Sequence, residues 1–334
     1  MIIALDADGG DYAPRELVKG AAQAAAEYGV DIALIGNKAV LEMLVRRYAK
    51  KRNITIIEAS QTIECSESPV QAVRSKPDSA IVIGTKLVKD GTASAFVSAG
   101  STGAVLAAAF LHLGRIKGVQ RPALCGIIQI QPESPVLLID VGANVDCRPE
   151  HLVQFGQLGA TFAKEFLYIE APKVGLLNNG AEEVKGNQLA KESFQHLKKV
   201  NLNFIGNVEG QDILSKKADV VVTDGFTGNI VLKALEGFGD AFLNVLGIGR
   251  SFRVDQQLQG SALVHYVELA SMAKRMDYTE YGGACLLGVN GNIIVSHGRS
   301  QARAIKNAIH VAHRATETKV VEAIKNSSYV TSNK

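Results

Sequence analysis

Six short polar segments carry most of the residue types that could do chemistry in this chain. Each follows a short apolar run and combines glycine with Asp, Asn, Ser or Thr. The segments are residues 6–14, 98–104, 140–146, 178–187, 223–229, and 281–284 together with 296–300. Glycine lets the backbone approach a ligand closely, and backbone amides with hydroxyl groups can hold an anion. Each segment alone is an ordinary turn, but six of them together indicate a site for an anion such as phosphate.

The side chains of these segments supply the candidate site residues. Lys185, with hydroxyls and amides around it, can hold a phosphate group, and Asn229 can donate a hydrogen bond to a developing oxyanion. Ser101 and Thr102 precede a predicted helix, where backbone amides favour an anion. The further candidates for binding phosphate or substrate are Asp6, Gly9, Gly10, Ser98, Gly103, Asn144, Asp224, Thr227 and Gly228.

Five carboxylates in the same segments would repel phosphate unless Lys, Arg or amide groups partner them. They are Asp6, Asp11, Asp140, Asp146 and Asp224. A second interpretation is that they bind Mg²⁺, since acidic residues near a phosphate often hold this ion. A third is that they cap the helices that follow. The sequence favours capping for Asp11 and Asp146, and a ligand role for Asp224.

The elements that must position these segments alternate between short apolar runs and longer amphipathic ones. The predicted strands are residues 2–5, 31–35, 54–58, 95–98, 124–129, 136–140, 173–176, 203–206, 220–223, 284–289 and 293–296. The predicted helices are residues 14–28, 38–49, 102–113, 149–166, 187–198, 227–246 and 301–324. This order predicts a largely parallel sheet covered by helices on both faces. Asn290-Gly291 suits a hairpin turn, which makes the sheet mixed. If the polar segments share one carboxyl edge, they converge on one cleft.

Length, charge and cysteine usage exclude several classes of protein. We expect one large α/β domain over residues 1–326, with a cleft and a helical protrusion near 230–276, and a frayed polar tail over 327–334. Thirty-six basic and 33 acidic residues give a net charge of +3, too even for a nucleic acid-binding protein. The four cysteines are far apart, which argues against disulfides and a zinc site. We expect neither a signal peptide nor a transmembrane helix, and peripheral membrane contact stays open.

Three familiar motifs are missing from the sequence. G-x-x-x-x-G-K-[ST] is absent, which excludes a Walker-type phosphate loop. No G-x-G-x-x-G follows the first predicted strand, which counts against dinucleotide binding. G-x-S-x-G is absent as well, which argues against a hydrolase with a serine nucleophile.

A series of ordered motifs resembles one known family. The motifs are ALDADGGDYAP, SAGSTGA, IDVGANVD, LLNNGAEEVKGN, NVEG, VVVTDGFTGNIVLK, YGGACLLGVNG and SHGRS. They are similar to those of PlsX, a family of bacterial phosphate acyltransferases, and the resemblance runs from Ile3 to about Ala323. The chain departs from the family at Asp8, where methionine is usual, and fits it only loosely over residues 246–261.

The resemblance implies a fold, a reaction and partners. The implied fold is a three-layer α/β/α arrangement with a mostly parallel mixed sheet, like that of isocitrate and isopropylmalate dehydrogenases and phosphotransacetylase. The implied enzyme is a cytoplasmic homodimer without an organic cofactor. It moves a long-chain acyl group from acyl carrier protein to inorganic phosphate. The acyl-phosphate product supplies phospholipid synthesis through a membrane glycerol-3-phosphate acyltransferase, and family members associate peripherally with the membrane.

The same resemblance implies roles for single residues. Ser101, Thr102 and Lys185 orient phosphate for attack on the thioester carbonyl. Asn229 and backbone amides stabilise the tetrahedral oxyanion. Lys185, or a nearby acid such as His297, assists departure of the thiolate. The family pattern makes Lys185 and Asn229 the strongest catalytic candidates.

An apolar stripe follows Asn229 on the predicted helix. Its residues are Leu232, Leu235, Phe238, Phe242, Val245 and Leu246, and the basic residues Arg250, Arg253, Lys274 and Arg275 follow. Such a stripe is most often core or a dimer interface. It also suits contact with a membrane surface or with a carrier protein.

Other functions remain open on the residues alone. A phosphotransacetylase-like enzyme would use the same fold and phosphate site with acyl-CoA. An NAD-dependent decarboxylating dehydrogenase would need an arginine cluster, and arginine is sparse in the six segments. A non-catalytic scaffold for lipid enzymes would not need so many polar segments.

Overall fold

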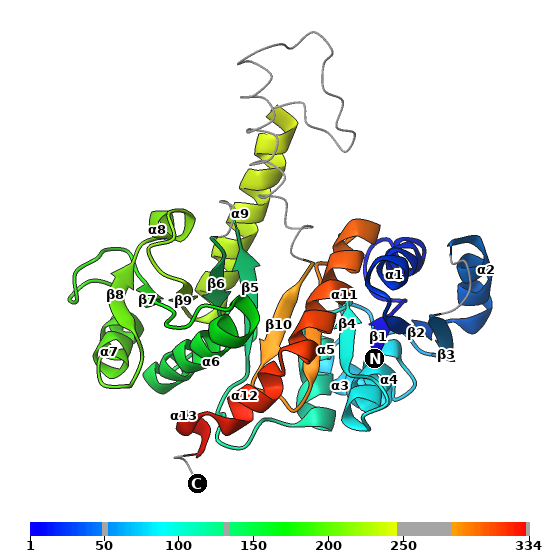
Figure 1. Cartoon of the computed structure of the whole chain (residues 1–334), viewed down its shortest axis with the longest axis horizontal. Coiled ribbons are helices and arrows are strands. Elements are labelled where there is room, and N and C mark those ends of the chain that lie inside the picture. Colours follow the sequence, from blue (N-terminus) through cyan, green and yellow to red (C-terminus); the bar gives the residue numbers. More distant parts are fainter. Residues whose placement is uncertain (49–52, 130–133, 246–281, 332–334) are drawn as a thin grey trace.

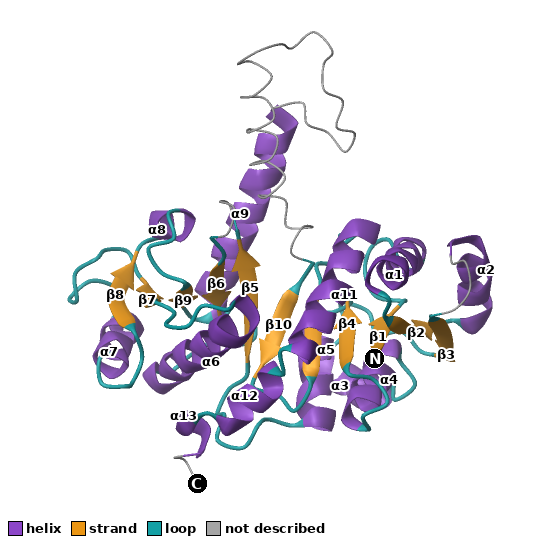
Figure 2. Ribbon diagram, viewed as in Figure 1, coloured by secondary structure: helices purple, strands orange, loops and turns teal. Residues whose placement is uncertain are grey.

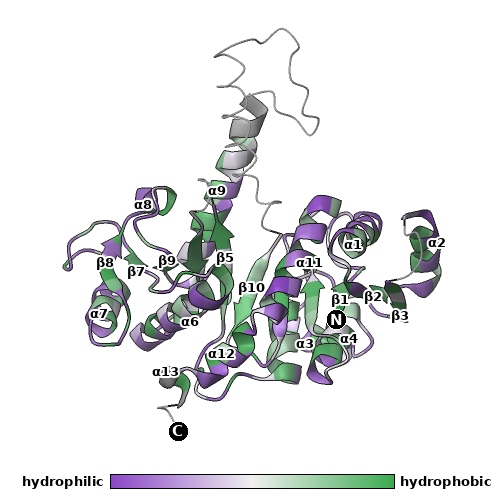
Figure 3. Cartoon of the chain, in the orientation of Figure 1, coloured by the Kyte–Doolittle hydropathy of each residue, from purple (hydrophilic) through white to green (hydrophobic). Residues whose placement is uncertain are grey.

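The computed structural model describes residues 1–48, 53–129, 134–245 and 282–331, in which eleven strands form one sheet (Figures 1 and 2). In sheet order the strands are β3 (Ile54–Glu58), β2 (Asp31–Gly36), β1 (Ile2–Asp6), β4 (Ala95–Ser98), β11 (Asn292–Val295), β10 (Ala284–Leu287), β5 (Ala123–Ile128), β6 (Val136–Ile139), β9 (Val220–Val222), β7 (Val174–Leu177) and β8 (Phe204–Val208). Most are short runs of Val, Ile and Leu, because helices bury the sheet on both faces. Figure 3 shows this apolar character along the strands.

The strands form two parallel blocks that run in opposite directions. β3, β2, β1, β4 and β11 are parallel to one another, and so are β6, β9, β7 and β8. Between the blocks, the pairs β11–β10, β10–β5 and β5–β6 are all antiparallel. Three successive reversals leave the second block opposed to the first. The sheet is therefore mixed and mostly parallel, as predicted.

This reversal corrects the expectation of one shared carboxyl edge. The loops after β1, β4 and β11 leave one edge of the sheet, and those after β6, β9 and β7 leave the other. The hairpin between β10 and β11 is present where Asn290-Gly291 predicts it. A hairpin reverses the chain once, and its pairing with β5 reverses the strand direction again, so hairpin chemistry alone does not reveal the opposed blocks.

Helices cover the two faces in separate layers. One face packs against α1 (Arg15–Tyr28), α2 (Lys38–Tyr48), α6 (Pro149–Leu167), α7 (Gln188–Leu197), α11 (Ala302–Glu317) and α12 (Val320–Asn326). The other packs against α3 (Pro69–Ser75), α4 (Ala80–Lys89), α5 (Thr102–Ala108), α8 (Gly210–Leu214) and α9 (Gly225–Val245). The chain thus has the predicted three-layer α/β/α architecture. In Figure 1, α9 extends well beyond the edge of the sheet.

Some predicted helices differ from the structure in physically simple ways. The predicted helix 301–324 is divided into α11 and α12 by Lys319, whose φ of 52° lies in the left-handed region. The predicted helix 102–113 begins as α5 and ends in a π-helical turn, Ala109–Leu113. The sequence analysis missed α3, α4 and α8. Of these, α4 has the sequence AIVIGTKLVK, whose β-branched residues favour a strand until tertiary packing overrides them.

The predicted frayed tail is wrong for the residues that the structure describes. Ser328–Thr331 form the short helix α13. Val330 is only 4% exposed, and the Tyr329 hydroxyl lies 3.0 Å from Thr161 Oγ1 on α6. One buried side chain and one polar contact are enough to hold a segment whose composition is otherwise polar. None of the helices within the described ranges has both the length and the apolar character that crossing a bilayer requires.

Candidate active site

The Asp6 carboxylate joins the first two polar loops at the carboxyl ends of β1 and β4. Its Oδ1 accepts backbone hydrogen bonds from Asp8 and Gly9 at 3.1 and 3.0 Å, and Ser98 Oγ donates to its Oδ2 at 2.7 Å. A Cβ at Gly9 would lie 2.5 Å from Asp6 Oδ2 and 2.6 Å from the Gly100 nitrogen, so only glycine fits there. Asp6, Gly9 and Ser98 therefore fix the loops after β1 and β4 relative to each other and have a structural role.

The Asp8 carboxylate is directed toward the end of β2. Its Oδ1 would lie 2.6 Å from a Cβ placed at Gly36. Burial raises the pKa of Asp8, and a backbone hydrogen bond from Asn37 acts in the opposite direction. This departure from the family pattern thus lies beside β2, and Asp8 does not line the cavity between α5 and α9 that is described below.

Burial raises the pKa of Asp6 from 3.8 to about 6, although its hydrogen bonds act in the opposite direction. The folded protein therefore binds this proton more tightly than the unfolded chain. The resulting stabilisation is complete below about pH 4 and is lost as the pH rises through 6. Relative to an Asp6→Asn variant, the wild-type free energy of unfolding should fall by about 2 kcal/mol between pH 4 and pH 7. Urea unfolding at both pH values measures this difference. Asp146→Asn, at an exposed position, is the control, and parallel pH profiles for wild type and Asp6→Asn would contradict the prediction.

Asp140 plays the corresponding part at the end of β6. Its side chain is fully buried and accepts backbone hydrogen bonds from Leu124, Gly142, Ala143 and Asn144 at 2.7–3.2 Å. The Asn144 side chain donates to Asp140 Oδ2 and to the Pro122 carbonyl, both at 2.8 Å. Burial raises the pKa of Asp140. The side-chain amide of Asn144, a predicted binding residue, thus donates hydrogen bonds that stabilise the loop after β6.

The first turn of α9 packs directly on this loop. A Cβ at Gly228 would lie 1.9 Å from the Asp140 carbonyl oxygen, and one at Gly225 would lie 2.6 Å from the Asn144 carbonyl oxygen. Both positions therefore require glycine. The contact brings Asn229 against Gly142, where a Cβ would lie 3.3 Å from Asn229 Nδ2.

The helix-capping predictions are reversed in the structure. Both Asp224 oxygens accept hydrogen bonds from Thr227 at 2.8 Å, one from its backbone and one from its hydroxyl. Asp224 thus caps α9, where a ligand role was favoured. Asp11 and Asp146 cap no helix among the described residues, because α1 begins after Pro14 and α6 after Arg148. Composition places an acidic residue near a helix start, but only the backbone path decides which one reaches the free amides.

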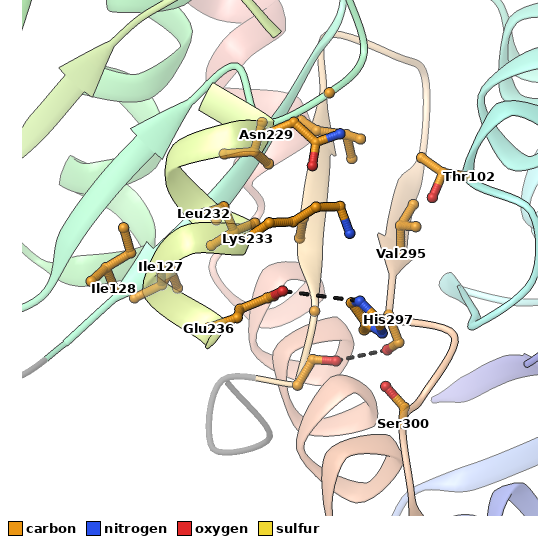
Figure 4. Close-up of a pocket in the computed structure, with 18 of the residues that line it drawn as sticks. Thr102, Ile127, Ile128, Asn229, Leu232, Lys233, Glu236, Val295, His297 and Ser300 are labelled. Carbon is orange, nitrogen blue, oxygen red and sulfur yellow. Dashed lines mark hydrogen bonds and ion pairs between the residues drawn. The ribbon is translucent and has the colours of Figure 1, made fainter. Parts of the chain in front are cut away.

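A cavity lined by both polar and apolar side chains lies between α5 and α9 on one face of the sheet (Figure 4). Its volume is about 350 Å³. Both parallel blocks contribute to it, through the loops after β4, β11 and β6 and through α9. The apolar lining includes Leu106, Leu124, Ile127, Ile128, Val141, Leu232, Leu235 and Val295. The polar lining includes Thr102, Gln129, Asn229, Lys233, Glu236, Ser296, His297 and Ser300.

The structure brings only some of the predicted site residues into this cavity. Thr102, Gly103, Asn229 and His297 line it. Ser101 stands behind them as the cap of α5, its hydroxyl accepting a hydrogen bond from the Ala104 amide at 3.5 Å. Gly10, with a φ of 100°, turns the first loop toward Gly298.

Lys185 does not line this cavity. It is exposed in the loop between β7 and α7, where its backbone carbonyl accepts a hydrogen bond from Asn178 Nδ2 at 3.2 Å. Asp224 and Thr227 line a separate cavity of about 450 Å³, together with Gly186 and Asn187 next to Lys185. The predicted catalytic pair is therefore separated: Asn229 lines the cavity between α5 and α9, whereas Lys185 lies next to residues of the second cavity.

Two ionisable cavity residues escaped the sequence analysis. Lys233 and Glu236 lie on α9 four and seven residues beyond Asn229, so all three share one face of the helix. This helical spacing was the available signal. Glu236 Oε2 lies 4.0 Å from His297 Nε2, which joins α9 to the end of β11 across the cavity (Figure 4). The Ser296 hydroxyl donates to the Gly282 carbonyl at 2.7 Å and holds the start of β10 beside it.

Comparison with known proteins shows a matching family model and similar phosphate acyltransferases. Residues 1–323 match the model of a family described as fatty acid synthesis protein. The chain is 58% identical over 324 residues to a phosphate acyltransferase of Dehalococcoides mccartyi, covering 97% of this chain and 93% of the relative. It is 47% identical over 329 residues to a phosphate acyltransferase of Pelotomaculum thermopropionicum, covering 98% and 95%.

Solved structures show the same fold at low sequence identity. A phosphotransacetylase from Streptococcus pyogenes superposes with a TM-score of 0.60 at 17% identity, covering 96% of this chain and 94% of the other. A 4-hydroxythreonine-4-phosphate dehydrogenase from Klebsiella pneumoniae superposes with a TM-score of 0.53 at 12% identity, covering 93% and 99%. These likenesses concern the arrangement of helices and strands, which agrees with the predicted phosphotransacetylase-like architecture.

Proposed function

The chain belongs to the fatty acid synthesis protein family as a phosphate acyltransferase, and we propose that it transfers a long-chain acyl group from acyl carrier protein to inorganic phosphate. The product is an acyl-phosphate, and the leaving group is the phosphopantetheine thiol of the carrier. The proposal uses no organic cofactor, no metal and no nucleic acid.

One observation carries the choice of substrates. The cavity between α5 and α9 combines an apolar floor, to which β5 contributes Leu124, Ile127 and Ile128, with polar groups in the same lining. An acyl thioester attacked by phosphate needs both, because a hydrocarbon chain must lie next to a doubly charged anion. Burial of each methylene group favours binding by about 0.8 kcal/mol, so an apolar floor of this kind favours a longer acyl chain over acetyl.

The proposed reaction needs no acyl-enzyme intermediate, because phosphate is itself a competent nucleophile. A phosphate oxygen attacks the thioester carbonyl, and a carbon–oxygen bond forms as the carbonyl electrons move to oxygen. The Asn229 amide, which lines the cavity, donates a hydrogen bond to this oxyanion. The oxyanion then collapses, the carbon–sulfur bond breaks, and the thiolate takes up a proton. We assign the supply of that proton to His297, which lines the cavity with its Nε2 4.0 Å from Glu236 Oε2.

Lys185 remains a second catalytic candidate on its chemistry and its family motif. We expect Lys185→Ala to lower turnover more than tenfold, since an ammonium group near the leaving thiolate stabilises the developing charge. Steady-state thiol release measures this effect. Lys191→Ala, at an exposed position on α7, is the control. A turnover within twofold of wild type would remove Lys185 from the mechanism and is compatible with its place outside the cavity.

The function itself is tested by thiol release from palmitoyl–acyl carrier protein, with and without inorganic phosphate. The expected result is release that depends on phosphate, with one acyl-phosphate formed for each thiol. Release from acetyl-CoA in place of the carrier thioester would favour a phosphotransacetylase-like enzyme. No release from either donor would favour a non-catalytic scaffold.

We also propose that the protein is a cytoplasmic homodimer that contacts the membrane peripherally, where a glycerol-3-phosphate acyltransferase uses its product. The residues of the predicted apolar stripe on α9 differ in burial. Leu232 and Leu235 pack against the core and line the cavity, whereas Phe238 is 57% exposed. The side chains of Phe242 and Val245, and the residues from Leu246 through Arg275, lie outside the described part of the chain. Sedimentation equilibrium tests the dimer. Flotation with anionic vesicles tests membrane contact, and failure to float would exclude it.

A further inference from the structure

The cavity between α5 and α9 contains three ionisable side chains among the described residues. They are Lys233 and Glu236 from α9 and His297 from the loop after β11. Glu236 and His297 face each other at 4.0 Å, and their side chains are 11% and 26% exposed. Lys233 has no ion pair in the described part of the chain, although Glu236 lies only one turn further along the same helix. Its ammonium group is therefore available to a ligand.

The helix directs Lys233 into the reacting end of the cavity. Lys233 is four residues beyond Asn229, so the two side chains lie one above the other on the same face of α9. Long helical side chains lean toward the helix N-terminus, which brings the lysine stem toward Asn229. Figure 4 shows Lys233 extending from α9 across the cavity toward the strand that carries Val295. Leu232 and Leu235 of the same helix also line the cavity and add to its apolar lining.

Lys233 is exposed, so an anion that enters the cavity from solvent can reach its ammonium group. An ammonium group donates three hydrogen bonds and binds phosphate as a point charge. The ammonium is also close in the chain to the residue proposed to hold the oxyanion. A phosphate held by Lys233 would thus lie beside the thioester carbonyl that it attacks.

We propose that Lys233 is a phosphate-binding residue of this enzyme and holds the attacking phosphate within the cavity. The inference rests on the proposed function and adds to it a residue that the sequence motifs did not single out. Lys233 supplies a cation within the cavity, so phosphate binding there does not depend on Lys185, which does not line the cavity.

The test compares the KM values for the two substrates in Lys233→Met, Lys233→Arg and Lys164→Met. Loss of a charge-assisted hydrogen bond of about 1.5–3 kcal/mol corresponds to a rise of about 10- to 100-fold in the KM for phosphate in Lys233→Met. The KM for palmitoyl–acyl carrier protein should stay within twofold of wild type. Lys233→Arg should recover most of the phosphate affinity. Lys164→Met removes the same charge from an exposed site on α6 and should change neither KM.

A second readout separates this inference from the proposed function. Calorimetric titration with inorganic phosphate alone should show binding to wild type and to Lys164→Met, and binding at least tenfold weaker to Lys233→Met. This holds whichever thioester the enzyme uses. An unchanged phosphate affinity in Lys233→Met would overturn the inference, as would a fall in turnover with an unchanged KM for phosphate. Phosphate binding that needs Lys233, without acyl-phosphate formation by the wild type, would support the inference and reject the proposed reaction.

Discussion

Asn229→Ala is expected to lower turnover about 100-fold while leaving the protein folded. Removal of one oxyanion donor typically costs about 3 kcal/mol of transition-state stabilisation, which corresponds to this factor. Asn229 lines the cavity, and its side chain has no hydrogen bond within the described residues. Its amide is therefore available to the substrate oxygen, and its loss should lower kcat more than it raises either KM.

The measurement is steady-state thiol release at saturating phosphate and acyl donor. Asn201→Ala, at an exposed position between α7 and β8, is the control and should keep the wild-type rate. Asn229→Asp should be at least as slow as Asn229→Ala, because a carboxylate repels the oxyanion. A turnover of Asn229→Ala within threefold of wild type would exclude the oxyanion role.

Gly228→Ala is expected to lower the free energy of unfolding by about 3 kcal/mol or more. The new methyl group would lie 1.9 Å from the Asp140 carbonyl oxygen and 3.0 Å from the Asp140 carbonyl carbon. Both are backbone atoms held by the Asp140 hydrogen bonds, so no side-chain rotation relieves the clash. Insertion of one extra carbon into a well-packed core costs about 1–3 kcal/mol, and sometimes more. The remaining relief is to shift α9, which moves Asn229, Lys233 and Glu236 together.

This variant should therefore lose activity as well as stability, with turnover more than tenfold below wild type at a temperature where it is still folded. Urea unfolding and thiol release measure the two effects. Gly237→Ala on the same helix is the matched control, because no atom of the described residues lies within 4 Å of its added Cβ. There alanine should stabilise the helix by up to about 1 kcal/mol. Equal effects of the two substitutions would contradict the role given to the contact between α9 and the Asp140 loop.

Most strands and long helices of the fold, and the polar residues of its loops, could be predicted from the sequence. Hydrophobic periodicity is local, so most strands and long helices could be placed within a few residues of their observed ends. Polar loops after strands could likewise be recognised, because Gly, Asp and Asn have local conformational roles. The family could be identified for the same reason, since its motifs lie in these loops. Where local preference and packing disagree, as in α4, the prediction failed.

The opposed direction of the two parallel blocks could not be predicted. It depends on pairing between β10 and β5, in which Cys285 lies opposite Cys125. Residues so distant in the chain leave no local signal of their pairing. The consequence reaches the site, because Lys185 follows β7 and Asn229 follows β9 at one edge, while Thr102 and His297 follow strands that end at the other. The cavity extends over the sheet face between these edges, so Asn229 lines it with Thr102 and His297, whereas Lys185 does not.

The sequence by itself determined which residues could bind phosphate and stabilise an oxyanion, because those capacities belong to side-chain chemistry. It also placed Asn229 at the start of a helix, because a helical repeat follows this residue. Only the tertiary structure decided which of these residues share a cavity. Close backbone contacts at Gly225 and Gly228 set the position of α9, and this position brings the helix face that carries Asn229, Lys233 and Glu236 into one cavity with Thr102 and His297. Such contacts join segments from different strands, and their geometry exists only once the sheet has formed.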